Sequence, residues 1–245
     1  MGHRNIAVIG DGATDIAIFL KIIAEVILSS DSLTTVELNR QSNLHDCVER
    51  YWTVVKKKKE KEYYLPSEHA TQLQKDVTNI LMGAFDDFEN RGTSIISNQD
   101  ILLVTTDAEI VLSKPNDYFQ EWAFSISKIF MGAIDKFYNI KTIEGYYGEY
   151  LPLIIPIVTF PCNEIFVAAA KNISNPYGKK PSELKILLYG TDDLATLREE
   201  ELQEKALDFI TPDSIQRIFS CLPESRIFIQ MLSFGKVTLE QNYET

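Results

Sequence analysis

Short apolar runs alternate along the chain with longer segments that carry apolar residues at helical spacing. Runs of strand length, apolar or β-branched and bounded by turn residues, occupy 5–9, 33–38, 101–104 and 153–160. Helical spacing or helix-start signals occupy 16–28, 43–55, 66–89, 118–137, 163–170, 193–209, 213–222 and 224–233. Strands that alternate with helices in this way predict an α/β protein, with a Rossmann-like, mostly parallel sheet flanked by helices and a helical C-terminal extension.

The last predicted strand contains Pro156 and follows Pro152. Proline cannot donate a hydrogen bond to a sheet ladder, so we expect this strand at an edge or in an irregular position. The length of 245 residues fits one large domain or one domain with an extension. We predict an α/β domain at 1–183 with a helical insertion at about 43–92, and a helical extension at 184–245 packed on it.

The charge and the cysteine content limit the classes of function. The formal net charge is −11, with 35 acidic and 24 basic residues, so nucleic acid would require a local basic patch or neutralisation by metal ions. Three widely spaced cysteines give neither a disulfide framework nor a zinc pattern, and they suit a reducing cytoplasm. The first ten residues lack the layout of a signal peptide, and no apolar segment reaches the roughly 20 residues that a bilayer requires. We therefore expect a cytoplasmic protein without a membrane partner.

Acidic residues follow three of the predicted strands: Asp11 and Asp15, then Asp107 and Glu109, then Glu164. The carboxyl ends of parallel strands share one edge of a sheet, so these five carboxylates are expected to converge. Two unit charges about 4 Å apart repel by roughly 4 kcal/mol at an effective dielectric constant of about 20, which a bound cation relieves. Ligands that are all oxygen favour Mg²⁺, Mn²⁺ or Ca²⁺ over zinc.

Each carboxylate taken alone also has an ordinary structural explanation. Asp15 and Glu164 lie in the first turns of predicted helices, where the helix dipole favours an acid. Asp107 and Glu109 lie in a connection after a strand, where acidic residues are common. The order of the three groups, each after a strand, is what favours a shared functional site.

The same segments resemble a known family. NIAVIGDGATDIAIF at 5–19 and ILLVTTDAEI at 101–110 are similar to the first two motifs of Toprim domains, in which a strand ends in an acid-Gly turn or in Asp-x-Asp. TFPCNEIFVAAAKN at 159–172 resembles the third acidic segment of small standalone Toprim proteins of the RloB type, found near bacterial restriction and phage-defence genes. NPYGKKPSEL at 175–184 is similar to the lysine-containing stretch that follows in such proteins.

The resemblance implies a compact Rossmann-like domain that binds Mg²⁺ or Mn²⁺ for phosphodiester chemistry on nucleic acid, as a nuclease in a phage-defence setting. The metal ligands that it implies are Asp11, Asp107, Glu109 and Glu164, with Asp15 as a neighbour, and Asp11 or Glu164 would move the proton. The chain departs from the family at Asp11, where Toprim domains normally have Glu, and at Glu109, where they have Asp.

Two other hypotheses remain open. A non-catalytic Toprim-like binding module, acting as an effector subunit through a protein partner from the same locus, is favoured by the net negative charge and by the two substituted acids. GDGATD at 10–15 also resembles the last acidic motif of haloacid-dehalogenase-type phosphatases. Those enzymes need an upstream Asp-x-Asp nucleophile, and only ten residues precede Asp11.

Overall fold

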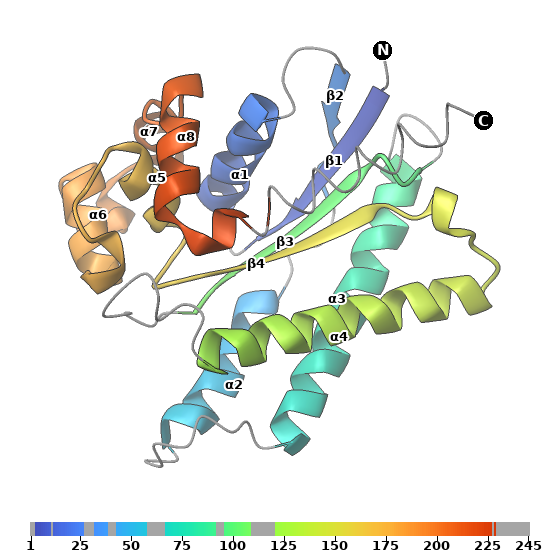
Figure 1. The fold of residues 1–245 in the computed structure, drawn as a ribbon. Helices are drawn as coiled ribbons and strands as arrows, with labels where there is room; N and C mark the ends of the chain where they lie inside the picture. The colour runs from blue at the N-terminus through green and yellow to red at the C-terminus, as the bar shows by residue number, and fades with distance from the viewer. Residues whose placement is uncertain are drawn as a thin grey trace.

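The structure is a computed structural model that describes residues 3–10, 12–26, 32–38, 43–57, 67–91, 96–108 and 121–226, together with Phe228. Four parallel strands form one sheet in the order β2-β1-β3-β4 (Figure 1). The strands are β1 (His3–Ile9), β2 (Ser32–Thr35), β3 (Ile101–Asp107) and β4 (Leu153–Thr159). This confirms the α/β class. Each strand overlaps a run that the sequence predicts, but β2 ends three residues earlier than predicted and β3 continues three residues further, so that Asp107 is its last residue.

The order of the strands reverses at β1. The chain goes from β1 outward to β2 on one side, and then returns to add β3 on the other side. In open α/β sheets, ligands bind at such a switch point, in the crevice beyond the carboxyl ends of the two strands. Ile9 pairs with Val104 at this place, so the turn that starts with Gly10 and the last residues of β3 share one edge.

Helices cover both faces of the sheet. On one side lie α1 (Ala13–Val26), α5 (Glu164–Ala170), α7 (Glu199–Leu207) and α8 (Pro212–Cys221), and on the other lie α2 (Leu44–Lys57), α3 (Ser67–Arg91) and α4 (Glu121–Ile143) (Figure 1). Edge-to-face ring contacts hold each layer together. Phe19 packs on Phe166 at 5.0 Å between α1 and α5, and Phe85 packs on Phe137 at 5.6 Å between α3 and α4.

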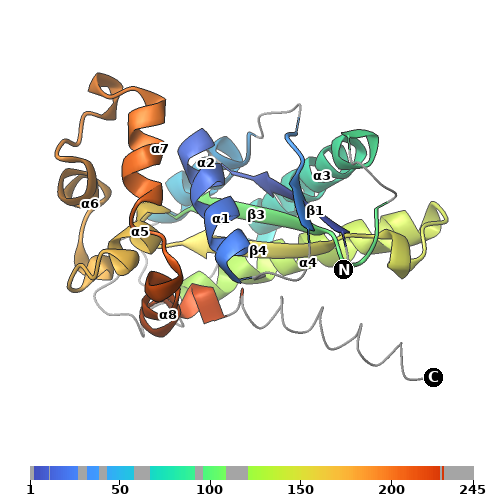
Figure 2. The same ribbon diagram turned by 90° about the horizontal axis from the view of Figure 1, so that it is seen from above.

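A further helix, α6 (Pro181–Tyr189), was not predicted. It begins with proline in the first turn and ends at Gly190, a left-handed residue with φ of 86°, which are ordinary helix limits. Together with α5 and α7 it lies beyond the carboxyl ends of β3 and β4 (Figure 2). The extension thus reaches the edge of the sheet where the carboxylates are expected.

Other predicted boundaries shift in the C-terminal part. The helix predicted at 193–209 begins only at Glu199, after a 3₁₀ turn at Leu194–Thr196, because Arg198 and Glu201 close a capping arrangement at its start. Two more 3₁₀ turns lie at Gly148–Tyr150 and Pro176–Gly178. Of the helix predicted at 224–233, residues 224–226 and 228 are helical and the others lie outside the described residues. The division into domains at 183 stays a prediction.

Strand β4 lies at an edge of the sheet, as its prolines predict. It pairs with β3 along its whole length, from Leu153 opposite Ile101 to Thr159 opposite Asp107. The pairing brings the turn after β4 next to the end of β3. In the described part of the chain, no helix combines the length and the apolarity that a membrane span needs.

Candidate functional site at the carboxyl edge of the sheet

Asp107 ends β3 at the carboxyl edge, beside the switch point. Its Oδ1 atom accepts a hydrogen bond from the Thr159 hydroxyl at 2.8 Å and another from the backbone N–H of Asn163 at 2.8 Å. The side chain is half-buried. Two donors on one carboxylate oxygen fix the orientation of the group, as partners of metal-binding carboxylates commonly do. The same bonds also tie β3 to the start of α5, which is a structural role in its own right.

Asn163 extends this network below the surface. It is completely buried, and the hydroxyl groups of Thr105 and Thr159 each lie 3.0 Å from its Oδ1, while its Nδ2 has no hydrogen-bond partner. A hydroxyl has one proton, and that of Thr159 also faces Asp107. If the amide is rotated by 180°, its Nδ2 donates to both threonine hydroxyls. Its Oδ1, an oxygen of the type that binds cations, then occupies the position where Nδ2 had no acceptor.

Glu164 opens α5 and is a buried residue, with 11% of its side chain exposed. Lys185 of α6 lies opposite this carboxylate, with its Nζ 4.0 Å from Glu164 Oε1. Tyr189, one turn further along α6, is 5% exposed and has a buried hydroxyl without a hydrogen-bond partner. Burial raises the pKa of Tyr189, and the charges of Glu164 and Asp15 raise it further, so the phenol stays protonated near both carboxylates.

Cys162 is a buried thiol in the turn after β4, near two of the predicted carboxylates. Its thiol is 3% exposed, and burial raises its pKa well above the ordinary value. The charges of Glu164 and Asp107 raise the pKa further, which places both carboxylates close to this sulfur. The thiol therefore stays protonated beside these charged carboxylates, and a protonated thiol is a weak nucleophile.

The turn after β1 is closely packed at Gly10. A Cβ atom at Gly10 would meet Ile16 Cγ1 at 3.2 Å and Thr105 Cγ2 at 3.3 Å, so a larger residue there would push these side chains aside by a few tenths of an ångström. Asp15 follows in the first turn of α1 and is half-buried. Glycine at Gly10 thus lets the start of α1 approach β3, and this approach brings Asp15 toward the same edge as Asp107.

The structure brings three predicted residues to one edge through shared neighbours. The charges of Asp107 and Glu164 both raise the pKa of Cys162, and the charges of Asp15 and Glu164 both raise the pKa of Tyr189. Asp11 and Glu109 lie outside the described residues. Within the ranges that the structure describes, no three His, Cys, Asp or Glu side chains are arranged to hold a metal ion. The described carboxylates are hard oxygen ligands of the kind that Mg²⁺ requires. The predicted ligand set also includes Asp11 and Glu109.

Three residues of this edge were missed by the sequence reasoning: Asn163, Lys185 and Tyr189. Asn163 stands beside Glu164 in the third motif, where a carboxamide before an acid gives no signal by itself. Lys185 and Tyr189 have the i, i+4 spacing of one helix face, so predicting a helix over 181–189 would have grouped them.

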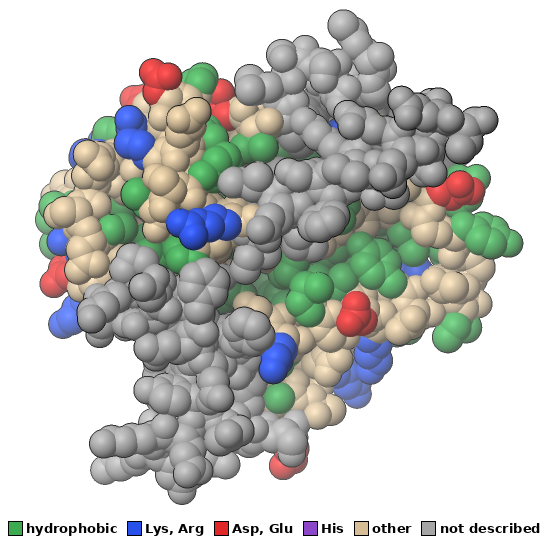
Figure 3. All heavy atoms as spheres, viewed as in Figure 1, with side chains coloured by type: hydrophobic (Ala, Val, Ile, Leu, Met, Phe, Trp, Pro, Cys, Tyr) green, Lys and Arg blue, Asp and Glu red, His purple; other side chains and the backbone are tan. Residues whose placement is uncertain are grey.

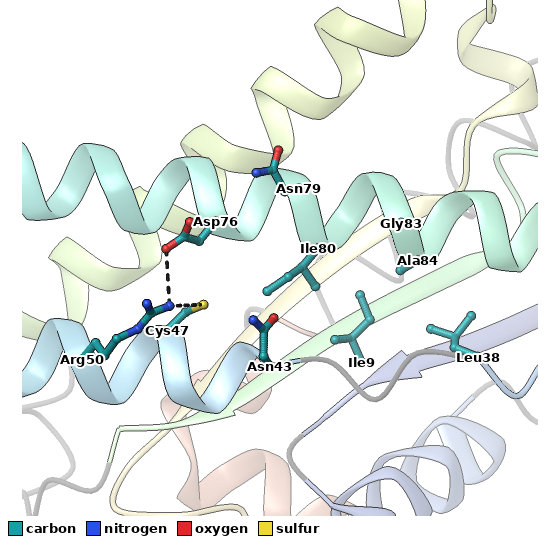
Figure 4. Close-up of a pocket in the computed structure, with 10 residues that line it drawn as sticks. All are labelled: Ile9, Leu38, Asn43, Cys47, Arg50, Asp76, Asn79, Ile80, Gly83 and Ala84. Atoms are coloured by element: carbon teal, nitrogen blue, oxygen red, sulfur yellow. Dashed lines mark hydrogen bonds and ion pairs between the residues drawn. The ribbon is translucent and has the colours of Figure 1, made fainter.

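A cavity of about 260 Å³ lies on the opposite side of β1, between α2 and α3. Figure 4 shows Arg50 of α2 and Asp76 of α3 paired with each other at one end of its lining, with Cys47 beside them. The Arg50 guanidinium donates to Cys47 Sγ at 3.1 Å and lies 3.8 Å from Asp76 Oδ2. The aliphatic part of the lining includes Ile9, the residue before Gly10, so the cavity adjoins the switch point.

The sequence also places a basic run at 56–59 close to Tyr51, Trp52, Tyr63 and Tyr64, a combination of charge and aromatic rings that would suit the stacking of bases. Tyr51 is 3% exposed and belongs to the core, so it is not available for stacking. Nothing is described of the other three aromatic side chains. On the face shown in Figure 3, the described basic and acidic side chains are scattered and form no single basic patch.

Comparison with known proteins gives no assignment. The chain matches none of the family models, none of the curated proteins and none of the solved structures with which it was compared. The function therefore has to be argued from the residues and their geometry.

Proposed function

We propose that the protein is a Toprim-like enzyme of the RloB type that uses Mg²⁺ or Mn²⁺ to hydrolyse a phosphodiester of nucleic acid, in a phage-defence setting. The observation that carries this proposal is the position of Asp107, oriented by Thr159 and Asn163 at the switch point of a doubly wound sheet. Asp15 and Glu164 approach the same edge, and Asp11 and Glu109 flank it in the sequence.

In this proposal Asp11, Asp107, Glu109 and Glu164 would hold the cation, with Asp15 as a neighbour. The cation, when bound, neutralises charge on the phosphate and activates water for attack. Glu164 or Asp11 would accept a proton from water as the water oxygen forms a new P–O bond and the ester P–O bond breaks. The leaving oxygen would take a proton from solvent. The depth of Glu164, at 8% exposure, suits this task because few competing waters reach it.

The cavity beside β1 supports nucleic acid over other phosphodiesters. Asn43 and Arg50 offer hydrogen-bonding groups at its rim, and Ile9 and Ile80 form apolar lining. A base has a hydrogen-bonding edge and an apolar face, so this mixture suits it. The phosphate attached to such a base would lie near the turn after β1.

A cleavage assay tests the proposal. Wild-type protein is incubated at low ionic strength with single-stranded DNA, double-stranded DNA or RNA, in Mg²⁺ or Mn²⁺ and then in EDTA. We expect metal-dependent cleavage by wild type, a loss of at least about a hundredfold in Asp107→Asn, and normal rates in the control Glu204→Gln, whose side chain is exposed on α7.

The alternative of a non-catalytic effector subunit predicts a different result in the same assay. If wild type leaves all three substrates intact with both metals, alone and with the protein encoded beside it, the enzymatic proposal is wrong. A melting temperature that still rises with Mg²⁺ would then favour the binding module.

A further inference from the structure

Tyr189 ends α6 with a buried hydroxyl that the fold leaves without a hydrogen-bond partner. Its backbone is well fixed, because the Gly190 N–H donates to Ile186 O at 2.9 Å and Lys205 Nζ donates to the Tyr189 carbonyl at 3.3 Å. The side chain is 5% exposed. A buried donor without an acceptor is destabilising, and most native structures avoid it, so this hydroxyl requires an explanation.

Lys185 lies one helical turn before Tyr189, on the same face of α6. Its Nζ, 4.0 Å from Glu164 Oε1, places this face against the start of α5. The separation is longer than a close ion pair, and the Lys185 side chain is 31% exposed, so the ammonium group can turn to another acceptor. A buried phenol without an acceptor and a partly exposed ammonium group beside Glu164 thus lie one helical turn apart on α6.

We propose that Lys185 and Tyr189 form an oxyanion subsite, which binds a phosphate group of the substrate beside Glu164. The Tyr189 hydroxyl donates to one non-bridging oxygen, and Lys185 neutralises part of the negative charge. The inference rests on the proposed function, because it places the phosphodiester next to the residues that would hold the cation. It also explains why the extension packs at this edge.

Binding of inorganic phosphate, measured by calorimetric titration in Mg²⁺ and separately in EDTA, tests the subsite. We expect Tyr189→Phe and Lys185→Gln each to weaken phosphate binding by at least about tenfold. The matched controls are Tyr150→Phe and Lys136→Gln, whose side chains are exposed on the Gly148–Tyr150 turn and on α4. Both controls should bind phosphate like wild type. Equal binding by all variants, or no binding by wild type in either buffer, overturns the subsite.

The stability of Tyr189→Phe gives a readout that does not depend on binding. The hydroxyl has no partner to lose, so the melting temperature of this variant should stay within about 2 °C of wild type or rise. A fall of more than about 5 °C would mean that the hydroxyl stabilises the fold itself, and the subsite would be wrong.

Failure of the subsite and failure of the proposed function give different results. Metal-dependent cleavage with full phosphate affinity in Tyr189→Phe and Lys185→Gln removes the subsite alone. Phosphate binding that both variants weaken, without cleavage in any metal, keeps the subsite and removes the nuclease. If a tetrathymidylate competes with inorganic phosphate for binding, the subsite is assigned to nucleic acid. If it does not compete, the subsite is assigned to small phosphate compounds.

Discussion

Thr159 donates a hydrogen bond to Asp107 across the β3–β4 ladder, at 2.8 Å between Oγ1 and Oδ1. The two residues are direct partners in the register of the parallel strands. The ladder itself therefore sets the orientation of the carboxylate, before any ligand binds. The N–H of Asn163 adds a second bond to the same oxygen, so the group is held from the strand and from the following turn.

The two bonds predict how substitutions of Asp107 affect stability. Asp107→Ala removes an acceptor from both donors and leaves the N–H of the completely buried Asn163 without a partner, so the free energy of unfolding should fall by roughly 3 kcal/mol. Asp107→Asn retains an oxygen at the same place and should lose about 1 kcal/mol or less. Urea denaturation measures both. Equal losses in the two variants would mean that Asp107 stabilises the protein by its charge and not by these bonds.

Cation binding should appear as added stability. Millimolar Mg²⁺ or Mn²⁺ should raise the melting temperature of wild type, because a ligand at 100 times its Kd adds about 2.7 kcal/mol to the free energy of unfolding. Glu109→Gln should lose most of this shift, and Glu204→Gln should keep it. Differential scanning fluorimetry over a series of metal concentrations makes the comparison. A shift of the same size in Glu109→Gln would place the cation elsewhere on the protein.

A buried acid away from the site predicts a dependence of stability on pH. Glu224 is 1% exposed and accepts a hydrogen bond from the Tyr177 hydroxyl. Burial raises the pKa of Glu224 from 4.5 to about 7, although the bond from Tyr177 lowers it. The folded state therefore binds the proton more tightly than the unfolded state does. This contribution is complete below about pH 4.5 and is lost as the pH rises to about 7, a change on the order of 3 kcal/mol.

Glu224→Gln isolates this effect, because glutamine stays neutral and can still accept the Tyr177 bond. The free energy of unfolding, measured in urea between pH 4.5 and 8, should fall with pH more steeply in wild type than in Glu224→Gln. The exposed acid in Glu204→Gln provides the control and should follow wild type. Parallel curves for wild type and Glu224→Gln would show that the pKa of Glu224 is the same in the folded and unfolded states.

The turn after β1 gives a steric prediction. Gly10→Ala places a methyl group 3.2 Å from Ile16 Cγ1 and 3.3 Å from Thr105 Cγ2, so we expect a loss of about 1 to 2 kcal/mol in stability. Gly148→Ala meets no atom within 4 Å and should change stability by less than about 0.5 kcal/mol. Chemical denaturation of both variants makes the comparison. A Gly10→Ala variant as stable as wild type would show that α1 can move away from β3 without cost.

The fold was predictable because each strand carries its own signal. The runs ending at Ile9 and Val104 are apolar on both faces, which is typical of parallel strands buried between helices, and Pro156 marked the edge position of β4. Helix α6 was missed because its sequence follows a segment rich in turn residues and is only nine residues long. Its limits are set by Pro181 and by the left-handed Gly190, which are local signals that the apolar periodicity does not contain.

The candidate site was predictable only in part. The acids could be predicted as a group because each follows a strand. Strands that alternate with helices form a parallel sheet, and the carboxyl ends of such strands share one edge. The partners of Asp107, in contrast, depend on the register that sets Thr159 opposite it, and no pattern in the sequence gives a register between strands some 50 residues apart. The position of Tyr189 near this edge could not be predicted for a related reason. It depends on how α6 packs on α5, and the sequence does not show this packing.

Pro156 has a consequence for association between molecules. It lies within β4, which pairs with β3 on one side, and a proline nitrogen is tolerated there when it points away from the neighbouring strand. The side of β4 that faces away from β3 then lacks one backbone N–H donor near the middle of the strand. A strand from a second molecule that approached this edge would find an incomplete partner, which disfavours polymerisation by strand addition and helps an apolar sheet stay dispersed at high concentration.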